Sequence, residues 1–167
     1  VMFTGIVEAI GQVVQIEKEG GNIHFTIETP IAKELKIDQS MAHDGTCLTV
    51  VKVMPEQHRY VVTAIQETLD KTALGSWSVG YEVNLELSMK MDGRFDGHIV
   101  QGHVDQTATC FKVEEMDGSW KFWFTYDKGL KNITVEKGSI SVNGVSLTVV
   151  DSEEGVFSVC IIPFTYQ

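Results

Sequence analysis

Two stretches of the chain carry side chains that could do chemistry, and they repeat each other: DGTCLTVV and NGVSLTVV. The first places Cys47 two residues before Thr49, and the second places Ser146 two residues before Thr148. Residues two apart on a strand point to the same face, so each stretch presents a small polar pair. Thiols and hydroxyls bind ligands through hydrogen bonds and, beside a base, act as nucleophiles. The repeat therefore predicts two equivalent ligand sites in one chain.

Two histidines in GHIVQGHVD are the other candidates for acid–base chemistry. His98 and His103 are an odd number of residues apart, so on a regular strand they face opposite ways and form a poor metal pair. No third ligand stands at a useful spacing, and we expect no metal site. A lone histidine near a strand is typically a hydrogen-bonded structural residue, which is our interpretation of His98. The first half has Ile6 at the position of His103, so His103 is the more suggestive candidate.

Composition and charge restrict the partners and the compartment. The formal charge of −10 opposes binding to nucleic acid or to an anionic membrane surface. No stretch resembles a signal peptide or reaches the roughly 20 apolar residues of a membrane span, so we expect a cytoplasmic protein. The three cysteines, Cys47, Cys110 and Cys160, are odd in number and lack Cys-x-x-Cys spacing, which predicts free thiols. We interpret Cys110 and Cys160 as small buried hydrophobic residues.

Alternating runs of Val, Ile, Thr and Phe, separated by Gly, Asp and Asn, predict an all-β fold. We expect only brief helices, at 31–36 and 128–132. The expected strands are IGQVVQI, NIHFTIET, TCLTVVKV, YVVTAI, YEVNLEL, ATCFKVE, KFWFTY, SISVNG, SLTVV and VFSVCII.

The duplication extends beyond the two octapeptides. An offset of 99 residues relates Ser40 to Ser139, and an offset of 97 relates Gly5 to Gly102 and Thr68 to Thr165. Short insertions in turns reconcile the two offsets. We therefore predict two homologous β-barrels, at 1–90 and 98–167, joined by a linker at 91–97. The second copy ends before any counterpart of YEVNLEL, so we expect it to lack its last strand.

Strand alternation divides each repeated stretch into two faces. Leu48 and Val50 share one face of the first stretch, as Leu147 and Val149 do in the second. These aliphatic side chains suit a barrel interior. The polar pairs then lie on the opposite face, beside the glycine turn that precedes each strand.

Five motifs in order resemble those of the riboflavin synthase family of the two-barrel, α-subunit type: MFTGIVEAIG, DGTCLTVV, GHIVQGHVD, GSISVNGVSLTVV and CIIPFTYQ. The resemblance covers essentially the whole chain. It implies tandem six-stranded Greek-key β-barrels, each binding lumazine. The family's chain continues to complete the second barrel and adds a C-terminal helix that forms a homotrimer.

The resemblance also implies a reaction that needs no cofactor. Two molecules of 6,7-dimethyl-8-ribityllumazine react, and one donates a four-carbon unit to the other. The products are riboflavin and 5-amino-6-ribitylamino-uracil. In the family, the reacting pair lies between the first barrel of one subunit and the second barrel of its neighbour.

Carried over to this sequence, the resemblance implies two substrate pockets. The first is expected to use Phe3, Gly5, Ile6, Val7, Ser40, Cys47, Leu48, Thr49, Thr63, Ala64, Ile65, Gln66, Glu67 and Thr68. The second is expected to use Gly102, His103, Val104, Lys137, Ser146, Leu147, Thr148, Ile161, Ile162, Pro163, Phe164, Thr165 and Tyr166.

The expected catalytic groups are His103, Ser146, Thr148 and Cys47. A base such as His103, or a group hydrogen-bonded to Ser146 and Thr148, could remove a proton from the C7 methyl of one lumazine. Water or the Cys47 thiol could add at C7 of the other. The sequence leaves open which group is the base and which barrel holds the donor.

The sequence bears on three functions other than riboflavin synthesis. A non-catalytic relative that binds lumazine or flavin as a fluorescent antenna stays open, although His103, Ser146 and Lys137 together favour an enzyme. A flavin-binding reductase barrel would show Arg-x-Tyr-Ser/Thr, whereas Arg59 is followed by Tyr-Val-Val and Arg94 by Phe-Asp-Gly. A nucleic-acid-binding barrel would need a basic, aromatic groove, which the net charge opposes.

Overall fold

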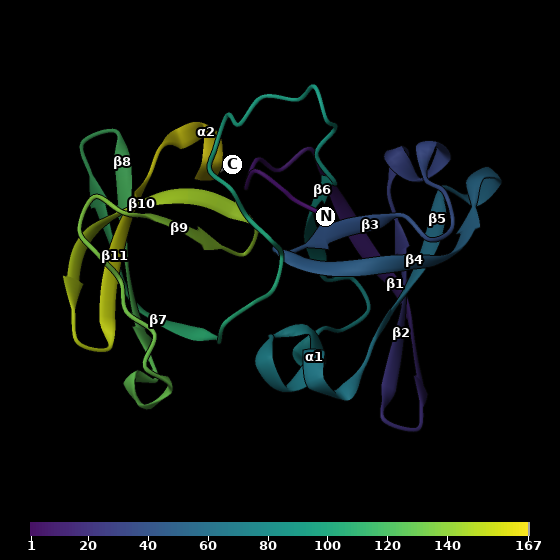
Figure 1. Ribbon diagram of the computed structural model, residues 1–167, viewed down its shortest axis with the longest axis horizontal. Coiled ribbons are helices and arrows are strands. Elements are labelled where there is room, and N and C mark those ends of the chain that lie inside the picture. Colours follow the sequence, from purple (N-terminus) through teal and green to yellow (C-terminus); the bar gives the residue numbers. More distant parts are fainter. Residues whose placement is uncertain (167) are drawn as a thin grey trace.

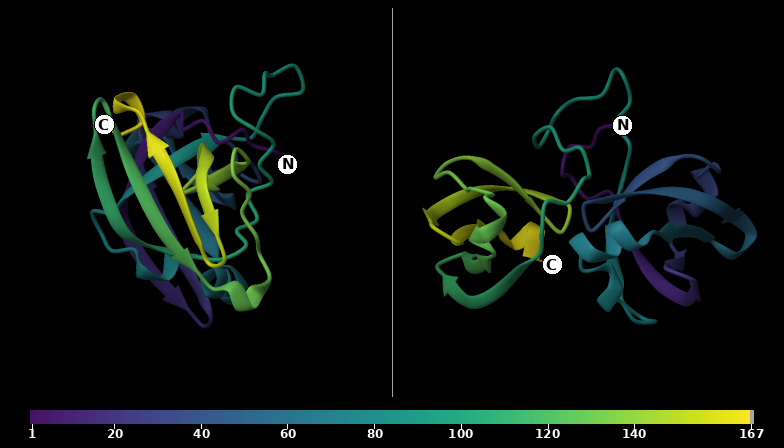
Figure 2. Two further views of the ribbon diagram at one scale, coloured as in Figure 1. Left: turned by 90° about the vertical axis from the view of Figure 1, so that its left-hand side faces the viewer. Right: turned by 60° about the horizontal axis from the view of Figure 1, so that its bottom comes forward.

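The computed structural model describes residues 1–166, and Gln167, the last residue of the expected second barrel, lies outside them. The chain forms two β units that lie side by side, the first coloured purple to teal and the second green to yellow (Figure 1). A long irregular segment connects them and arches over their junction (Figure 2). Within the described residues, no helix is both long and apolar enough to cross a membrane.

The first β unit is a closed antiparallel barrel with the strand order β1-β2-β5-β4-β3-β6. Its strands are β1 (Ala9–Glu19), β2 (Asn22–Glu28), β3 (Ser40–His43), β4 (Thr46–Met54), β5 (Arg59–Ala64) and β6 (Glu82–Leu87). Its short helices are η1 (Pro30–Glu34), η2 (Pro55–Gln57), α1 (Gln66–Lys71) and η3 (Leu74–Ser76).

The second β unit is a five-stranded sheet with the order β7-β8-β11-β10-β9. Its elements are β7 (Ala108–Met116), β8 (Ser119–Tyr126), η4 (Lys128–Leu130), β9 (Ser139–Val142), β10 (Val145–Glu153), β11 (Val156–Ile161) and α2 (Pro163–Tyr166). In the first unit β6 pairs with both β1 and β3. Over residues 1–166 no strand does the same for β7 and β9, which confirms the expected lack of a last strand.

The local predictions hold for nearly all elements. Each of the ten predicted runs forms a strand, while β3 is an additional one. The two expected helices are short 3₁₀ helices, η1 and η4. Helices α1 and α2 were not predicted; they begin 97 residues apart (163 − 66) and so extend the duplication. The boundaries expected at residues 90 and 98 stay a prediction.

The two units differ in how completely they bury their cores. The first encloses a fully buried set that includes Phe25, Tyr60 and Val50. Among the described apolar side chains of the second unit, only Val149, Phe157 and Val159 are buried, and the others are partly or fully exposed. An open sheet cannot exclude water from its inner face as a closed barrel does.

The predicted faces of the repeated strands are confirmed. Leu48 and Val50 are buried in the first unit, and Val149 is buried in the second, with Leu147 packed against the same core. The polar pairs lie on the outer face of β4 and β10. Thr49 and Thr148 are exposed, and Cys47 and Ser146 are half-buried.

The repeated turns touch each other at the junction of the two units. Gly45 and Gly144 have φ of +82° and +79°, a region that favours glycine. A Cβ added to Gly45 would lie 2.8 Å from the backbone nitrogen of Gly144, and one added to Gly144 would lie 2.7 Å from that of Gly45. A side chain at either glycine would therefore collide with the opposite turn, which explains why both copies keep the glycine.

Candidate functional site

Two backbone hydrogen bonds cross the junction as a matched pair. The Ser146 N–H donates to the Gly5 carbonyl at 2.7 Å, and the Cys47 N–H donates to the Gly102 carbonyl at 2.8 Å. Gly5 and Gly102 occupy equivalent places in the duplication, with φ of +75° and +79°. Each polar pair is therefore bordered by the glycine of the opposite half.

This crossing corrects the expected grouping of the pockets. The sequence analysis places Gly5, Ile6 and Val7 with Cys47, and Gly102, His103 and Val104 with Ser146. The structure associates each glycine with the other strand, so this grouping is wrong. The physical reason is an antiparallel bridge between Phe3 and Val100, which holds the two segments against each other as they pass between the units.

The group beside Ser146 is His98. The His98 Nδ1 lies 2.7 Å from the Ser146 Oγ, and the His98 N–H donates to the Thr4 carbonyl at 3.0 Å. A side chain on the preceding Gly97 would overlap that carbonyl oxygen. Burial lowers the pKa of His98 below its ordinary value. The imidazole is therefore neutral near pH 7, which is the form that accepts a proton.

No hydrogen bond joins His103 to Ser146 in the part of the chain that the structure describes. It is exposed and follows Gly102, which lies against Cys47, so His103 belongs to the side of the first unit. The sequence leaves two candidate bases open, and His98 fits the second of them, a group hydrogen-bonded to Ser146. Which group acts as the base stays a prediction. The hydrogen bonds of His98 agree with our interpretation of it as a hydrogen-bonded histidine. Its partner Ser146 was not predicted, because the two residues are 48 positions apart and no local pattern signals their contact.

Ser40, Cys47 and Thr49 come together on neighbouring strands of the first unit. Ser40 is the ladder partner of Thr49 between β3 and β4. Burial raises the pKa of the Cys47 thiol, and a hydrogen bond with Ser40 partly opposes that rise. The thiol is therefore protonated near pH 7. It is better suited to hydrogen bonding than to attack as a free thiolate.

The other expected contact residues fall into two groups, and their contact with a ligand stays a prediction. Phe3, Leu48 and Ala64 are buried, so their side chains support the site from beneath. The Thr63 hydroxyl is already hydrogen-bonded to His24 at 2.8 Å. Those at the surface or partly so are Lys137, Leu147, Ile161 and the segments around α1 and α2: Ile65, Gln66, Glu67, Thr68, Ile162, Pro163, Phe164, Thr165 and Tyr166.

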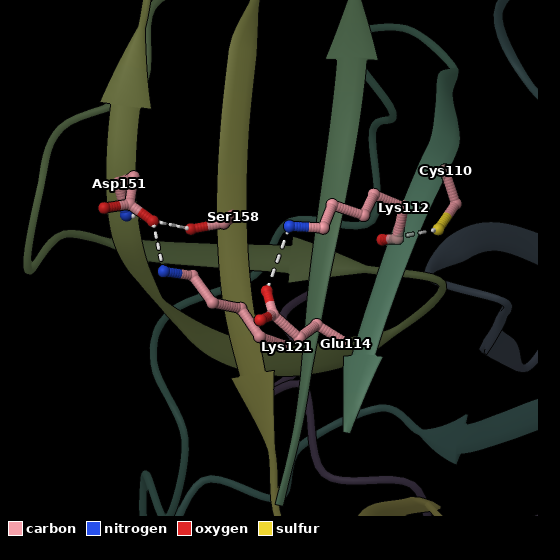
Figure 3. A network of polar contacts seen from close by, with 6 residues as sticks. All are labelled: Cys110, Lys112, Glu114, Lys121, Asp151 and Ser158. Carbon is pink, nitrogen blue, oxygen red and sulfur yellow. Dashed lines mark hydrogen bonds and ion pairs between the residues drawn. The ribbon is translucent and has the colours of Figure 1, made fainter. Parts of the chain in front are cut away.

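The outer face of the second unit carries a separate polar network (Figure 3). Lys121 forms an ion pair with Asp151 at 2.7 Å, and the Ser158 hydroxyl donates to the same carboxylate. Lys112 pairs with Glu114 at 3.0 Å. Within residues 1–166, no hydrogen bond or ion pair links these residues to Ser146 or Thr148, and surface ion pairs of this kind contribute little to stability. We assign the network no role in the site.

The expected burial of two cysteines is wrong. Cys110 and Cys160 are both exposed. Cys160 follows Val159 on β11, and because Val159 points into the core, strand alternation turns Cys160 outward. Cys110 lies on β7, an edge strand with exposed side chains throughout. Free thiols are as expected for all three cysteines.

Residues 1–166 offer no cluster of metal ligands at the site, and two surface hollows lie away from it. Within residues 1–166, no group of three His, Cys, Asp or Glu side chains could hold a metal ion. Two shallow hollows lie over β1, β2, β4 and β5, around Glu17 and His24, and neither is lined by Cys47 or Ser146. We favour the polar pairs as the site because they combine an imidazole, hydroxyls and backbone geometry that is matched in the two units, whereas the hollows involve the first unit alone.

The protein is a closed barrel beside a matching sheet, and each unit carries a small polar pair at the equivalent place. The family described as "Lumazine binding domain" matches residues 4–88 and 101–167. The fold is also that of solved LumP structures. One, complexed with 6,7-dimethyl-8-(1'-D-ribityl) lumazine, has a TM-score of 0.85 and 22% identity and covers 96% of this chain and 86% of that one. Another, with riboflavin, has a TM-score of 0.84 and 23% identity and covers 98% and 89%.

More similar sequences are found among curated proteins. The riboflavin synthase of Actinobacillus pleuropneumoniae is 38% identical over 167 residues, which are 99% of this chain and 77% of that protein. The riboflavin synthase of Bacillus subtilis is 38% identical over 165 residues, which are 98% and 76% of the two chains. The chain belongs to the riboflavin synthase family.

Proposed function

We propose that the protein binds 6,7-dimethyl-8-ribityllumazine beside each polar pair and converts two such molecules to riboflavin and 5-amino-6-ribitylamino-uracil. This is a transferase reaction in which one molecule passes a four-carbon unit to the other. The observation that carries the proposal is the hydrogen bond of His98 to Ser146, a neutral base on a hydroxyl within a strand signature that the chain contains twice.

The His98–Ser146 pair suits the removal of a proton from carbon. The C7 methyl of the lumazine is acidic because its carbanion delocalises into the ring. Ser146 would take the methyl proton as it passes its own to the Nδ1 of His98, so the charge moves to the imidazole and no cofactor is needed. General bases of this kind typically accelerate a reaction by roughly 10²–10⁴-fold.

The second polar pair suits the other substrate molecule. Cys47, Ser40 and Thr49 offer hydrogen bonds to ring carbonyls or ribityl hydroxyls. His103 follows Gly102, whose carbonyl accepts from the Cys47 N–H. The protonated Cys47 thiol favours water as the group that adds at C7. We further propose that the two molecules meet between copies of the chain in a homotrimer. Holding reactants in register is worth roughly 7–11 kcal/mol in well-oriented cases.

One experiment tests the proposal directly. The purified protein is mixed with the lumazine alone, without metal or cofactor, and riboflavin absorbance is followed. His98→Gln should reduce the rate at least 100-fold, because glutamine cannot accept the proton. His58→Asn is the matched control, because His58 is exposed in a turn with φ of 55°, a conformation that asparagine tolerates. Equal rates for His98→Gln and the wild type would contradict the assigned base.

A second function, ligand binding without turnover, is favoured by the likeness to the LumP structures. In that case the lumazine fluorescence would shift on binding and no riboflavin would form. The same mixture therefore separates the two functions.

A further inference from the structure

A buried carboxylate of the first unit accepts hydrogen bonds from the N-terminal segment that contacts the second unit. Glu86 on β6 is 5% exposed, and its ladder partner is Ala42 of β3. Its Oε1 accepts hydrogen bonds from the Thr4 N–H at 2.6 Å and from the Thr4 hydroxyl at 2.7 Å. Its Oε2 accepts one from the Gly5 N–H at 3.0 Å. A buried carboxylate needs such donors, because removal from water costs several kcal/mol.

The two residues that Glu86 holds contact both partners of the acid–base pair. The Thr4 carbonyl accepts from the His98 N–H at 3.0 Å, and the Gly5 carbonyl accepts from the Ser146 N–H at 2.7 Å. The N–H groups of Thr4 and Gly5 therefore donate to Glu86, while their carbonyls accept from the backbones of His98 and Ser146. These are the residues whose side chains meet at 2.7 Å.

We infer that Glu86 is a positioning residue for the His98–Ser146 pair, acting through Thr4 and Gly5 without touching the substrate. An effect of Glu86 on catalysis rests on the proposed function. Its effect on the positions of His98 and Ser146 does not, because the hydrogen bonds of Thr4 and Gly5 form without any ligand. A carboxylate suits the task since it offers acceptors on both oxygens and no donor.

Glu86→Gln is the decisive substitution. It keeps the size of the side chain but replaces one acceptor oxygen by an NH₂ group, which would face a backbone N–H. At least one of the bonds to Thr4 or Gly5 must then break. Glu8→Gln is the matched control: Glu8 is exposed, and its single bond, from the Leu87 N–H at 2.9 Å, can be kept by the glutamine oxygen.

The first measurement is amide hydrogen exchange of the protein without ligand. In Glu86→Gln, the amides of His98 and Ser146 should exchange at least tenfold faster, while the Lys137 amide, bound to the Val149 carbonyl at 2.9 Å, should not change. Glu8→Gln should leave all three unchanged. Unchanged exchange at His98 and Ser146 in Glu86→Gln would overturn the inference. An equal rise at Lys137 would also overturn it, by showing a global loss of stability.

The second measurement is the steady-state rate of riboflavin formation. Glu86→Gln should lower kcat at least tenfold and leave KM within about twofold, because the carboxylate does not contact the substrate. A change confined to KM would contradict a positioning role. If the wild type forms no riboflavin, the proposed function fails, but the exchange experiment still decides the role of Glu86.

Discussion

The pH dependence of folding stability should be governed in part by one histidine inside the first barrel. His43 is fully buried, as is Tyr60 beside it. Its Nδ1 lies 3.2 Å from the Met41 carbonyl, to which it donates, and its Nε2 lies 2.9 Å from the Tyr60 hydroxyl, from which it accepts. The neutral ring is therefore satisfied at both nitrogens. A protonated ring would be charged in the core and would lose the bond from Tyr60.

The size of the effect follows from the pKa. Burial lowers the pKa of His43 from 6.5 to about 4, with backbone hydrogen bonds opposing the shift. Between these two pKa values His43 is protonated in the unfolded chain but neutral in the folded protein. The free energy of unfolding therefore falls as the pH decreases through that range. The full effect is about 3 kcal/mol, from about 1.4 kcal/mol for each unit of the pKa shift, and about 2 kcal/mol of it appears between about pH 7.5 and pH 5.

Urea unfolding at the two pH values measures this change. Stopping at about pH 5 keeps most carboxylates ionised. His43→Gln should lose stability at pH 7.5 through poorer packing but should lack the about 2 kcal/mol decrease on acidification. His58→Asn should keep it, because His58 is exposed. The reasoning is refuted if His43→Gln loses as much stability as the wild type when the pH is lowered.

Three further predictions concern the junction and the site. Gly5→Ala should destabilise the protein by more than the about 1–2 kcal/mol of a left-handed alanine, because its Cβ would lie 2.7 Å from that of Ser146. Gly20→Ala, with φ of +58° and no atom within 4 Å, should show only that backbone cost in urea titrations, and equal losses would contradict the close contact. Iodoacetamide should alkylate Cys110 and Cys160 before Cys47, whose pKa is raised by burial, as mass spectrometry of quenched samples would show; first labelling at Cys47 would contradict this. The acid limb of kcat/KM should have its midpoint below pH 6.5, because burial lowers the pKa of His98, and a midpoint above 6.5 would exclude His98 as the base.

Local patterns predicted the strands well because a strand's faces depend on alternation alone. The burial of Leu48 and Val50 and the exposure of Thr49 follow from residue spacing. The burial assigned to Cys160 failed for a related reason: it came from the average behaviour of cysteine, although the alternation from Val159 already turned Cys160 outward. Position within the element outweighed residue type.

The sequence by itself determined that the chain is a duplicated all-β protein, where its strands other than β3 lie and which faces carry the polar pairs. Each of these rests on periodicity or on self-similarity within the chain. Only the tertiary structure decided that the Gly5 carbonyl accepts from Ser146 and the Gly102 carbonyl from Cys47. It also decided that His98 is the imidazole bonded to the Ser146 hydroxyl and that Glu86 binds Thr4 and Gly5. These contacts join residues 48 to 141 positions apart, and no local pattern specifies which distant partner a backbone carbonyl or a buried carboxylate will meet.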